Sequence, residues 1–254
     1  MKKYFPLFWV FYLLCAFSAH AGEGRYTIPL TGGGWSLWLD KEASWQNDRL
    51  YLPHEITDLS LLPVNVPTGG WQTLSHNPDA VPVEVPGTVE EYLTVTDNPR
   101  PENFRGVSWW YRKITIPADQ QKKRFIIYFE SVRMRAEVYL DGKLVAYDLI
   151  GETPFHVDIT DEAKPGKEQL LAIRVTNPGG NFHWQDFDIM KWGEYNIPPS
   201  RSFTGIIGRV KLESVNPVFI SDIYMQNTPE LTKVNAILSF TNETSSSAKQ
   251  DVEL

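Results

Sequence analysis

Residues 125–160, FIIYFESVRMRAEVYLDGKLVAYDLIGETPFHVDIT, contain the signals that decide the fold. The stretch opens with a continuous apolar run at 125–129, as expected of a strand that is covered on both faces. Apolar and polar residues then alternate over 133–140, which predicts a strand with one dry and one wet face. That strand runs into Asp141-Gly142, a pair that accepts the positive φ angles of a two-residue hairpin. Residues 143–147 provide the partner strand.

Short strands of this kind recur over most of the chain. From residue 25 to about 217 there is no long helical period, and turn residues interrupt the alternating runs about every 8–12 positions. Further strands are predicted at 153–159 and 170–175, and the glycine run 32–34 is interpreted as a flexible lead-in to the first strand. These signals predict an all-β protein with a sandwich or jelly-roll fold.

A second unit is predicted from residue 218 onward. Residues 220–226 and 234–241 are interpreted as strands, and 250–254 as the start of a third. Three strands cannot close a sandwich, and their edges would stay exposed. We therefore expect a domain that is cut after its third strand.

The first 21 residues, MKKYFPLFWVFYLLCAFSAHA, have the order of a secretory signal peptide. Two lysines precede an apolar run that is short for a membrane span, and an Ala-x-Ala pattern ends at Ala21. We therefore expect a periplasmic or secreted protein without a membrane span. Lipoprotein anchoring at Cys15 is the less favoured alternative.

Cleavage after Ala21 changes the composition. It removes the only cysteine and two lysines, which leaves 24 − 2 = 22 basic residues against 31 acidic ones, a net charge of −9. An acidic chain without a basic run is a poor candidate for nucleic acid. The chain also has nine tryptophans. Exposed aromatic faces commonly hold sugars, although a single Trp more often fills a core.

Several segments, in this order, resemble the N-terminal sugar-binding jelly roll of glycoside hydrolase family 2, which includes β-galactosidases, β-glucuronidases and β-mannosidases. They are VPGTVEEYL (85–93), GVSWWYRKITIP (106–117), the stretch 125–160, LLAIRVTNP (170–178) and SFTGIIGRVKLESV (202–215). The last departs most from the family pattern, at Thr204 and Gly208. After the predicted signal peptide at 1–21, the resemblance implies a galactose-binding-like jelly roll at 22–217 and an incomplete immunoglobulin-like sandwich at 218–254.

The resemblance also implies that this module packs beside a catalytic barrel. Glycoside hydrolysis usually needs two carboxyl groups, about 5–5.5 Å apart for retention and about 6.5–9.5 Å apart for inversion. In the family both are barrel glutamates, and a barrel takes about 250 residues, whereas 254 − 217 = 37 residues follow Pro217. We therefore expect no catalytic residue in this chain and no activity of the chain alone. No cofactor is expected, and no metal site, because the histidines lack metal-ligand spacing.

In the family, a jelly-roll loop reaches the barrel's active site, where an aspartate contacts the sugar and sometimes a monovalent cation. Residues 181–203 occupy that place, and a loop this long is more often functional than a short connection. Carboxylates accept hydrogen bonds from sugar hydroxyls, tryptophans offer stacking faces, and arginine pairs with carboxylates. The candidate residues are Asp188, Asp186, Arg201, Trp184 and Trp192. A second loop, 97–106, offers Asn103, with Asn98 as the alternative.

Three functional interpretations stay open. The first is the N-terminal part of a secreted, exo-acting β-glycosidase, with a β-glycoside and the catalytic barrel as partners. The second is a stand-alone carbohydrate-binding module, which predicts sugar affinity in this chain alone. The third is an assembly domain, which predicts homo-oligomers and no sugar binding. The alternative to a functional loop at 181–203 is that Trp184, Phe187 and Trp192 only pin it to the sandwich.

Overall fold

The computed structural model describes residues 24–43, 59, 64–93, 104, 106–148, 151, 153–177 and 203–249. Short strands dominate these ranges, as the sequence predicts. In chain order the elements are β1 (Arg25–Pro29), β2 (Gly32–Asp40), α1 (Gln72–His76), β3 (Val81–Val85), β4 (Gly87–Thr88), α2 (Val89–Tyr92), β5 (Gly106–Thr115), the 3₁₀ turn η2 (Ala118–Gln120), β6 (Arg124–Phe129), β7 (Val132–Arg133), β8 (Arg135–Leu140), β9 (Lys143–Asp148), β10 (Phe155–Asp158), β11 (Glu168–Asn177), β12 (Gly205–Ile206), β13 (Val210–Val215), β14 (Val218–Asn227) and β15 (Val234–Asn242).

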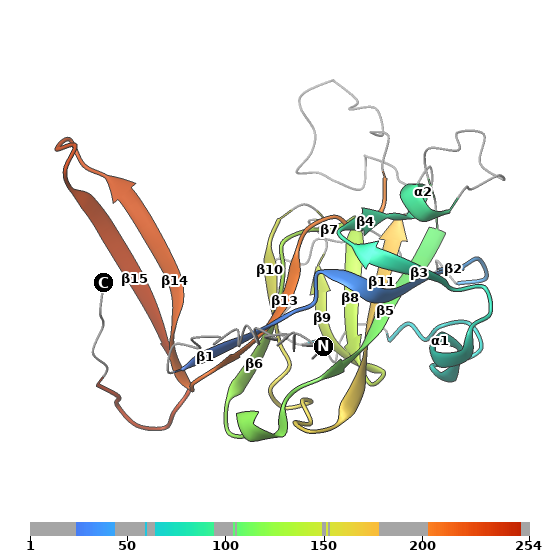
Figure 1. Cartoon of the computed structure of the whole chain (residues 1–254), viewed down its shortest axis with the longest axis horizontal. Helices are drawn as coiled ribbons and strands as arrows, with labels where there is room; N and C mark the ends of the chain where they lie inside the picture. The colour runs from blue at the N-terminus through green and yellow to red at the C-terminus, as the bar shows by residue number, and fades with distance from the viewer. Residues whose placement is uncertain are drawn as a thin grey trace, which may run out of the picture.

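Two antiparallel sheets form the sandwich (Figure 1). One has the strand order β3-β2-β5-β11-β8-β9 and the other the order β1-β13-β6-β10. Apolar side chains of both sheets meet in one buried cluster, to which Trp110 and Ile173 belong on the first sheet and Ile127 and Leu212 on the second. The prediction of an all-β jelly-roll sandwich is confirmed.

The predicted hairpin at Asp141-Gly142 is present. It joins β8 to β9, and Leu140 pairs with Lys143 across the turn. Asp141 has a φ angle of 48° and Gly142 one of 83°, so both turn residues adopt the left-handed conformation that this turn type requires. The Asp141 carboxylate also accepts a hydrogen bond from the Leu170 backbone N–H at 2.9 Å, which ties the turn to β11.

The prediction that β8 has a wet face is wrong. All six residues of β8 are buried, including Arg135, Glu137 and Tyr139. Residues 64–76 fold over this outer face of the sheet, where Trp71 and Leu74 pack with Trp109, Tyr139 and other apolar side chains in a second cluster. Trp109 and Tyr111 therefore belong to this outer cluster, while Trp110 fills the space between the sheets.

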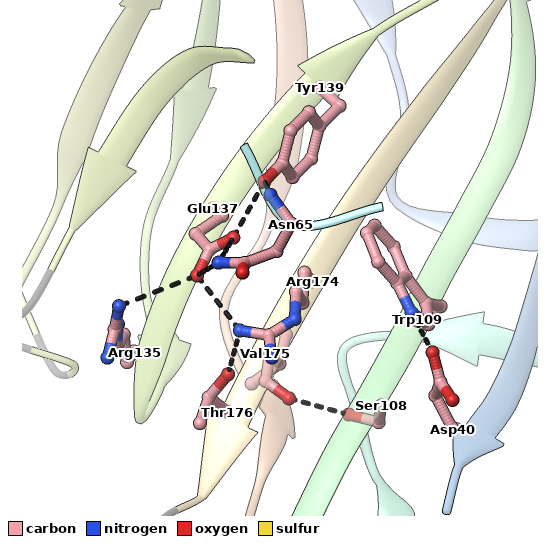
Figure 2. Close-up of polar contacts among 10 residues, drawn as sticks. All are labelled: Asp40, Asn65, Ser108, Trp109, Arg135, Glu137, Tyr139, Arg174, Val175 and Thr176. Carbon is pink, nitrogen blue, oxygen red and sulfur yellow. Dashed lines mark hydrogen bonds and ion pairs between the residues drawn. The ribbon is translucent and has the colours of Figure 1, made fainter. Parts of the chain in front are cut away.

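A polar network around Glu137 makes this burial possible (Figure 2). The Glu137 carboxylate accepts hydrogen bonds from Arg174 at 2.9 Å, from the Tyr139 hydroxyl at 2.7 Å and from the Asn65 side chain at 2.9 Å. Arg135 lies 3.7 Å away as a further cation. Burial and the neighbouring Glu137 carboxylate raise the pKa of Tyr139, which keeps the hydroxyl protonated as a donor. Alternation of polar residues therefore marks a network here rather than a solvated face.

Two further local predictions need correction. The run 125–129 is not covered equally on both faces, because Phe125, Ile127 and Phe129 are buried while Ile126 and Tyr128 are only half-buried. The glycines at 32–34 are not a lead-in, because they begin β2 and follow β1. The β2–β3 register shifts between Gly32 and Trp35, which is where residues without a side chain suit an irregular strand.

Strands β14 and β15 form a hairpin that stands apart from the sandwich in Figure 1. Several of its large apolar side chains are exposed, among them Ile223 at 55 % and Met225 at 56 %. The predicted third strand at 250–254 and the predicted signal peptide at 1–21 lie outside the described residues. Among the helices of the described ranges, none has the length and apolar character that a membrane crossing needs.

Candidate functional site

The six residues predicted to contact substrate lie outside the described residues. They are Asp188, Asp186, Arg201, Trp184, Trp192 and Asn103, and the alternative Asn98 lies outside as well. The structure does describe the residues that flank both loops: Leu93 and Phe104 beside one, Asn177 and Phe203 beside the other. The candidate site is therefore built from the loop bases upward.

Glu90 connects the bases of the two loops. It lies in the first turn of α2, after Thr88, whose hydroxyl caps the helix by accepting the Glu91 N–H at 3.2 Å. One oxygen of Glu90 accepts the Phe104 N–H at 2.8 Å, and the other accepts the Thr204 N–H at 3.2 Å. A single carboxylate thus accepts a backbone hydrogen bond at the point where each loop rejoins the sandwich.

Hydrogen bonds hold both the backbone and the side chain of Thr204. Its carbonyl accepts the Val89 N–H at 2.8 Å, and its hydroxyl donates to the Arg133 carbonyl at 2.8 Å. The residue has no exposed surface. The next residue, Gly205, opens β12, the central strand of the small sheet β4-β12-β7. A Cβ atom at Gly205 would lie 2.3 Å from the Gly87 carbonyl oxygen, so only glycine allows the strands to approach this closely.

The base of the longer loop is fixed from its other side by Asn177. This residue ends β11 and is the last described residue before 178–202. Its side-chain amide donates to the Phe104 carbonyl at 2.6 Å, and only 1 % of the residue is exposed. Asn177, Phe104, Glu90 and Thr204 therefore form one chain of contacts, which we call the loop-anchoring cluster.

A cation lies next to this cluster. The Arg133 guanidinium stacks over the Phe203 ring, with 4.6 Å between the guanidinium carbon and the ring centroid. Burial lowers the pKa of Arg133, and the nearby Glu90 carboxylate opposes that shift. The positive charge therefore stays beside the first described residue after the longer loop. In Figure 1, α2, β4 and β7 lie together at one end of the sandwich.

The loop-anchoring cluster holds the backbone of the loop bases in place, and Arg133 adds a positive charge beside it. These residues do not form a reaction centre by themselves. Within the described ranges, no group of three His, Cys, Asp or Glu side chains could hold a metal ion. Sequence reasoning singled out 85–93 only as part of a resemblance and missed the role of Glu90. The Thr88-x-x-Glu91 spacing does signal a helix start. The partners of Glu90, 14 and 114 residues away, carry no local signal.

Two curated proteins illustrate what the chain is similar to. A "Beta-glucuronidase" of Formosa agariphila is 31 % identical over 118 residues, which are 46 % of this chain and 12 % of that protein. A "Beta-galactosidase" of Thermoanaerobacter pseudethanolicus is 32 % identical over 124 residues, which are 48 % of this chain and 16 % of that protein. The chain thus spans only a small part of the length of these relatives.

Solved structures show the same fold. A β-glucuronidase from Ruminococcus gnavus in complex with D-glucuronic acid superposes with a TM-score of 0.59 at 17 % identity, covering 87 % of this chain and 35 % of that chain. A β-glucuronidase from an uncultured Clostridium sp. superposes with a TM-score of 0.57 at 20 % identity, covering 96 % of this chain and 36 % of that chain.

The family model described as "Glycosyl hydrolases family 2, sugar binding domain" matches residues 32–197. The match covers the sandwich strands from β2 to β11 and the loop 97–106. It also covers most of 181–203, including Asp186 and Asp188. Because it extends over more than half of the sequence, it confirms the resemblance: this chain belongs to glycosyl hydrolase family 2 and contains the sugar binding domain of that family.

Proposed function

We propose that this chain is the N-terminal carbohydrate-binding part of a secreted family 2 β-glycosidase. The loop 181–203 would contribute Asp188, with Asp186 and Arg201, to an active site on a catalytic barrel of the longer protein. The observation that carries the proposal is the loop-anchoring cluster. The two segments expected to meet substrate rejoin the sandwich at one carboxylate, Glu90, and so emerge from the same end of the fold.

The chemistry of the loops suits a β-glycoside. Sugar hydroxyls donate to carboxylates, and the amide of Asn103 both donates and accepts. Arg201 offers a planar pair of donors that matches a carboxylate. Names of the relatives, which include β-glucuronidases and a β-galactosidase, support a β-glucuronide or a β-galactoside as the substrates to try first.

The first test is the coding frame beyond the Leu254 codon. We expect it to continue into a barrel with two glutamates, and we expect the longer product to hydrolyse a 4-nitrophenyl β-glycoside. The 254-residue chain alone should release no nitrophenol. A frame that stops directly after Leu254 would overturn the proposal, and sugar binding by the chain without hydrolysis would then favour a binding module.

The second test is Asp188→Ala in the longer product. Loss of one hydrogen bond to a charged group costs about 1.5–3 kcal/mol, so kcat/KM should fall by about 10- to 150-fold. Asp222→Ala, the same change at an exposed acid on β14, is the matched control and should leave kcat/KM unchanged. Unchanged hydrolysis in Asp188→Ala would remove that residue from the site.

A further inference from the structure

A linker of two residues joins the sandwich to the β14–β15 hairpin. Strand β13 ends at Val215 and β14 begins at Val218, so only Asn216 and Pro217 lie between them. Proline fixes its own φ angle and restricts the residue before it to extended conformations, so this linker has few soft torsions. In Figure 1 the hairpin leaves the sandwich beside the start of β1. Side chains of the sandwich can therefore reach the base of the hairpin.

Two arginines flank the strand that leads into this linker. Val215, the last residue of β13, pairs with Arg25 on β1 and with Arg124 on β6. The Asn216 N–H, which follows directly, donates to the Gly24 carbonyl at 3.2 Å. The two arginines therefore occupy equivalent positions on either side of the point where the chain leaves the sandwich.

Arg25 connects the sandwich to the first strand of the hairpin. Its Nη1 donates to both oxygens of the Glu213 carboxylate on β13, at 3.2 and 3.3 Å. Its Nη2 donates to the Ile220 carbonyl on β14 at 2.8 Å. The β14–β15 register shifts between Ile220 and Asp222, and a bulge of this kind disrupts the ladder locally. Arg25 thus supplies a donor at the point where the pairing of the hairpin is irregular.

Arg124 makes the matching connection to the second strand. Its Nη2 pairs with the Asp158 carboxylate on β10, and its Nη1 lies 3.8 Å from the carboxylate of Glu243, which directly follows β15. The Glu243 N–H also donates to the Pro217 carbonyl at 3.0 Å, which closes the base of the hairpin onto the linker. In each connection, one carboxylate of the sandwich holds the guanidinium while another of its nitrogens faces the hairpin.

The paired arrangement opposes the motion that such a joint usually has. A small polar interface between two parts of a chain generally permits relative motion. One contact would leave the hairpin free to pivot, whereas contacts to both of its strands resist rotation about the linker. Because Glu213 and Asp158 already orient the two planar guanidinium groups, less side-chain entropy is lost when these groups contact the hairpin.

We infer that Arg25 and Arg124 form a clamp that holds the β14–β15 hairpin in one orientation relative to the sandwich, so that the joint at 216–217 is rigid and is not a hinge. The inference goes beyond the proposed function, because neither arginine belongs to the two loops or to the loop-anchoring cluster. It gives the two arginines a directional role: the chain that follows the hairpin starts from a fixed direction.

The test is a distance measurement between two spin labels by double electron–electron resonance. The full chain carries Cys15→Ser, which removes its only cysteine. The labels are attached at Thr115→Cys, at the end of β5, and at Thr232→Cys, between β14 and β15, both of which are exposed. We expect a single narrow distance distribution at low salt.

Arg25→Ala combined with Arg124→Ala should broaden this distribution. An exposed contact of a charged side chain favours the contacting arrangement by only about 1.4- to 5-fold, so the loss of both should lower the population ratio by about 2- to 25-fold. Arg209→Ala is the matched control, because Arg209 is an exposed arginine whose partner, Glu130, lies within the sandwich. The distribution should stay narrow in that variant.

Glu243→Ala separates the clamp from the stability of the sandwich, and it keeps the test valid if the double variant does not fold. It removes the hairpin side of one connection and leaves the pair of Arg124 and Asp158 in place. It should therefore broaden the distribution with little change in the melting temperature. About 1 M NaCl, at which the Debye length is about 3 Å, should broaden the distribution of the unsubstituted pair of arginines and change the double variant little.

Three results would overturn the inference. The distribution could already be broad at low salt with both arginines present, which would make the joint a hinge. It could stay narrow in the folded double variant and in Glu243→Ala, which would leave the linker alone responsible for the orientation. Arg209→Ala could broaden it as much as the double variant does, which would show a general effect of lost surface charge.

Discussion

Replacing Glu90 by alanine should release the bases of both loops at once. The change removes the carboxylate that accepts the N–H groups of Phe104 at 2.8 Å and Thr204 at 3.2 Å. Phe104 is 5 % exposed and Thr204 is fully buried, so water cannot readily replace the lost acceptor. A hydrogen bond to a charged group is worth about 1.5–3 kcal/mol. Each of the two amides should therefore exchange with solvent about 10- to 150-fold faster.

The assay is native-state hydrogen exchange followed by mass spectrometry, with fragmentation that resolves single amides. The Ile173 amide in the centre of β11 serves as the internal reference for global opening. Glu91→Ala is the matched control, because it removes a neighbouring carboxylate from the same turn of α2 without touching either loop base. Glu90→Gln retains a single acceptor oxygen and should protect one of the two amides better than the other.

Three results would refute this reasoning. Exchange at Phe104 and Thr204 could stay at the wild-type rate in Glu90→Ala. Glu91→Ala could accelerate the two amides as much as Glu90→Ala does. Ile173 could accelerate in parallel with them, which would show that Glu90 contributes to global stability and not to the loop bases.

Glu137→Ala removes the buried carboxylate that pairs with Arg174 and should lower the free energy of unfolding by about 3–5 kcal/mol in urea titrations; a loss below about 1 kcal/mol would contradict the network. Gly205→Ala places a Cβ 2.3 Å from a backbone oxygen and should cost about 1–3 kcal/mol, whereas Gly33→Ala, with nothing closer than 4.0 Å, should cost less in the same titration. Hydrogen bonds from Arg209 lower the pKa of Glu130 from its ordinary value of 4.5 to about 2. The pair therefore stabilises the folded state fully above pH 4.5, and this stabilisation is lost as the pH falls toward 2. NMR titration should show that midpoint, and Arg209→Gln should raise it; an unchanged midpoint would reject the pairing.

Local signals in the sequence predicted the strands well. The hairpin at Asp141-Gly142 depends on two adjacent residues that tolerate positive φ angles, and such a pair strongly favours a two-residue turn. The β14–β15 hairpin likewise follows from clean alternation, and both strands lie within a few residues of their predicted limits. The environment of β8 was not predictable in the same way. Alternation looks identical whether the second face meets water or, as here, the polar network around Glu137.

Prediction of the candidate site likewise worked from local sequence signals and missed contacts between distant residues. The resemblance led to the prediction of two functional loops, because family motifs are continuous stretches of sequence, and that prediction stays untested. The loop-anchoring cluster is not continuous, since Glu90 reaches one partner 14 residues away and another 114 residues away. Asp40 is similar: its buried carboxylate accepts hydrogen bonds from Thr68 and Trp109, which lie 28 and 69 residues away in the sequence. Only a folded chain reveals such positions.

The short length of α2 sharpens the argument about Glu90. A helix of four residues cannot be stable by itself, because nucleation costs more than one turn of hydrogen bonds returns. Its cap at Thr88 satisfies one N–H, and the Glu90 carboxylate ties it to the backbone of Thr204 and Phe104. The helix and the two loop bases therefore stabilise one another. Loosening either loop base should loosen α2 and, through it, the other base, so the backbone amides of Phe104 and Thr204 are expected to lose protection together.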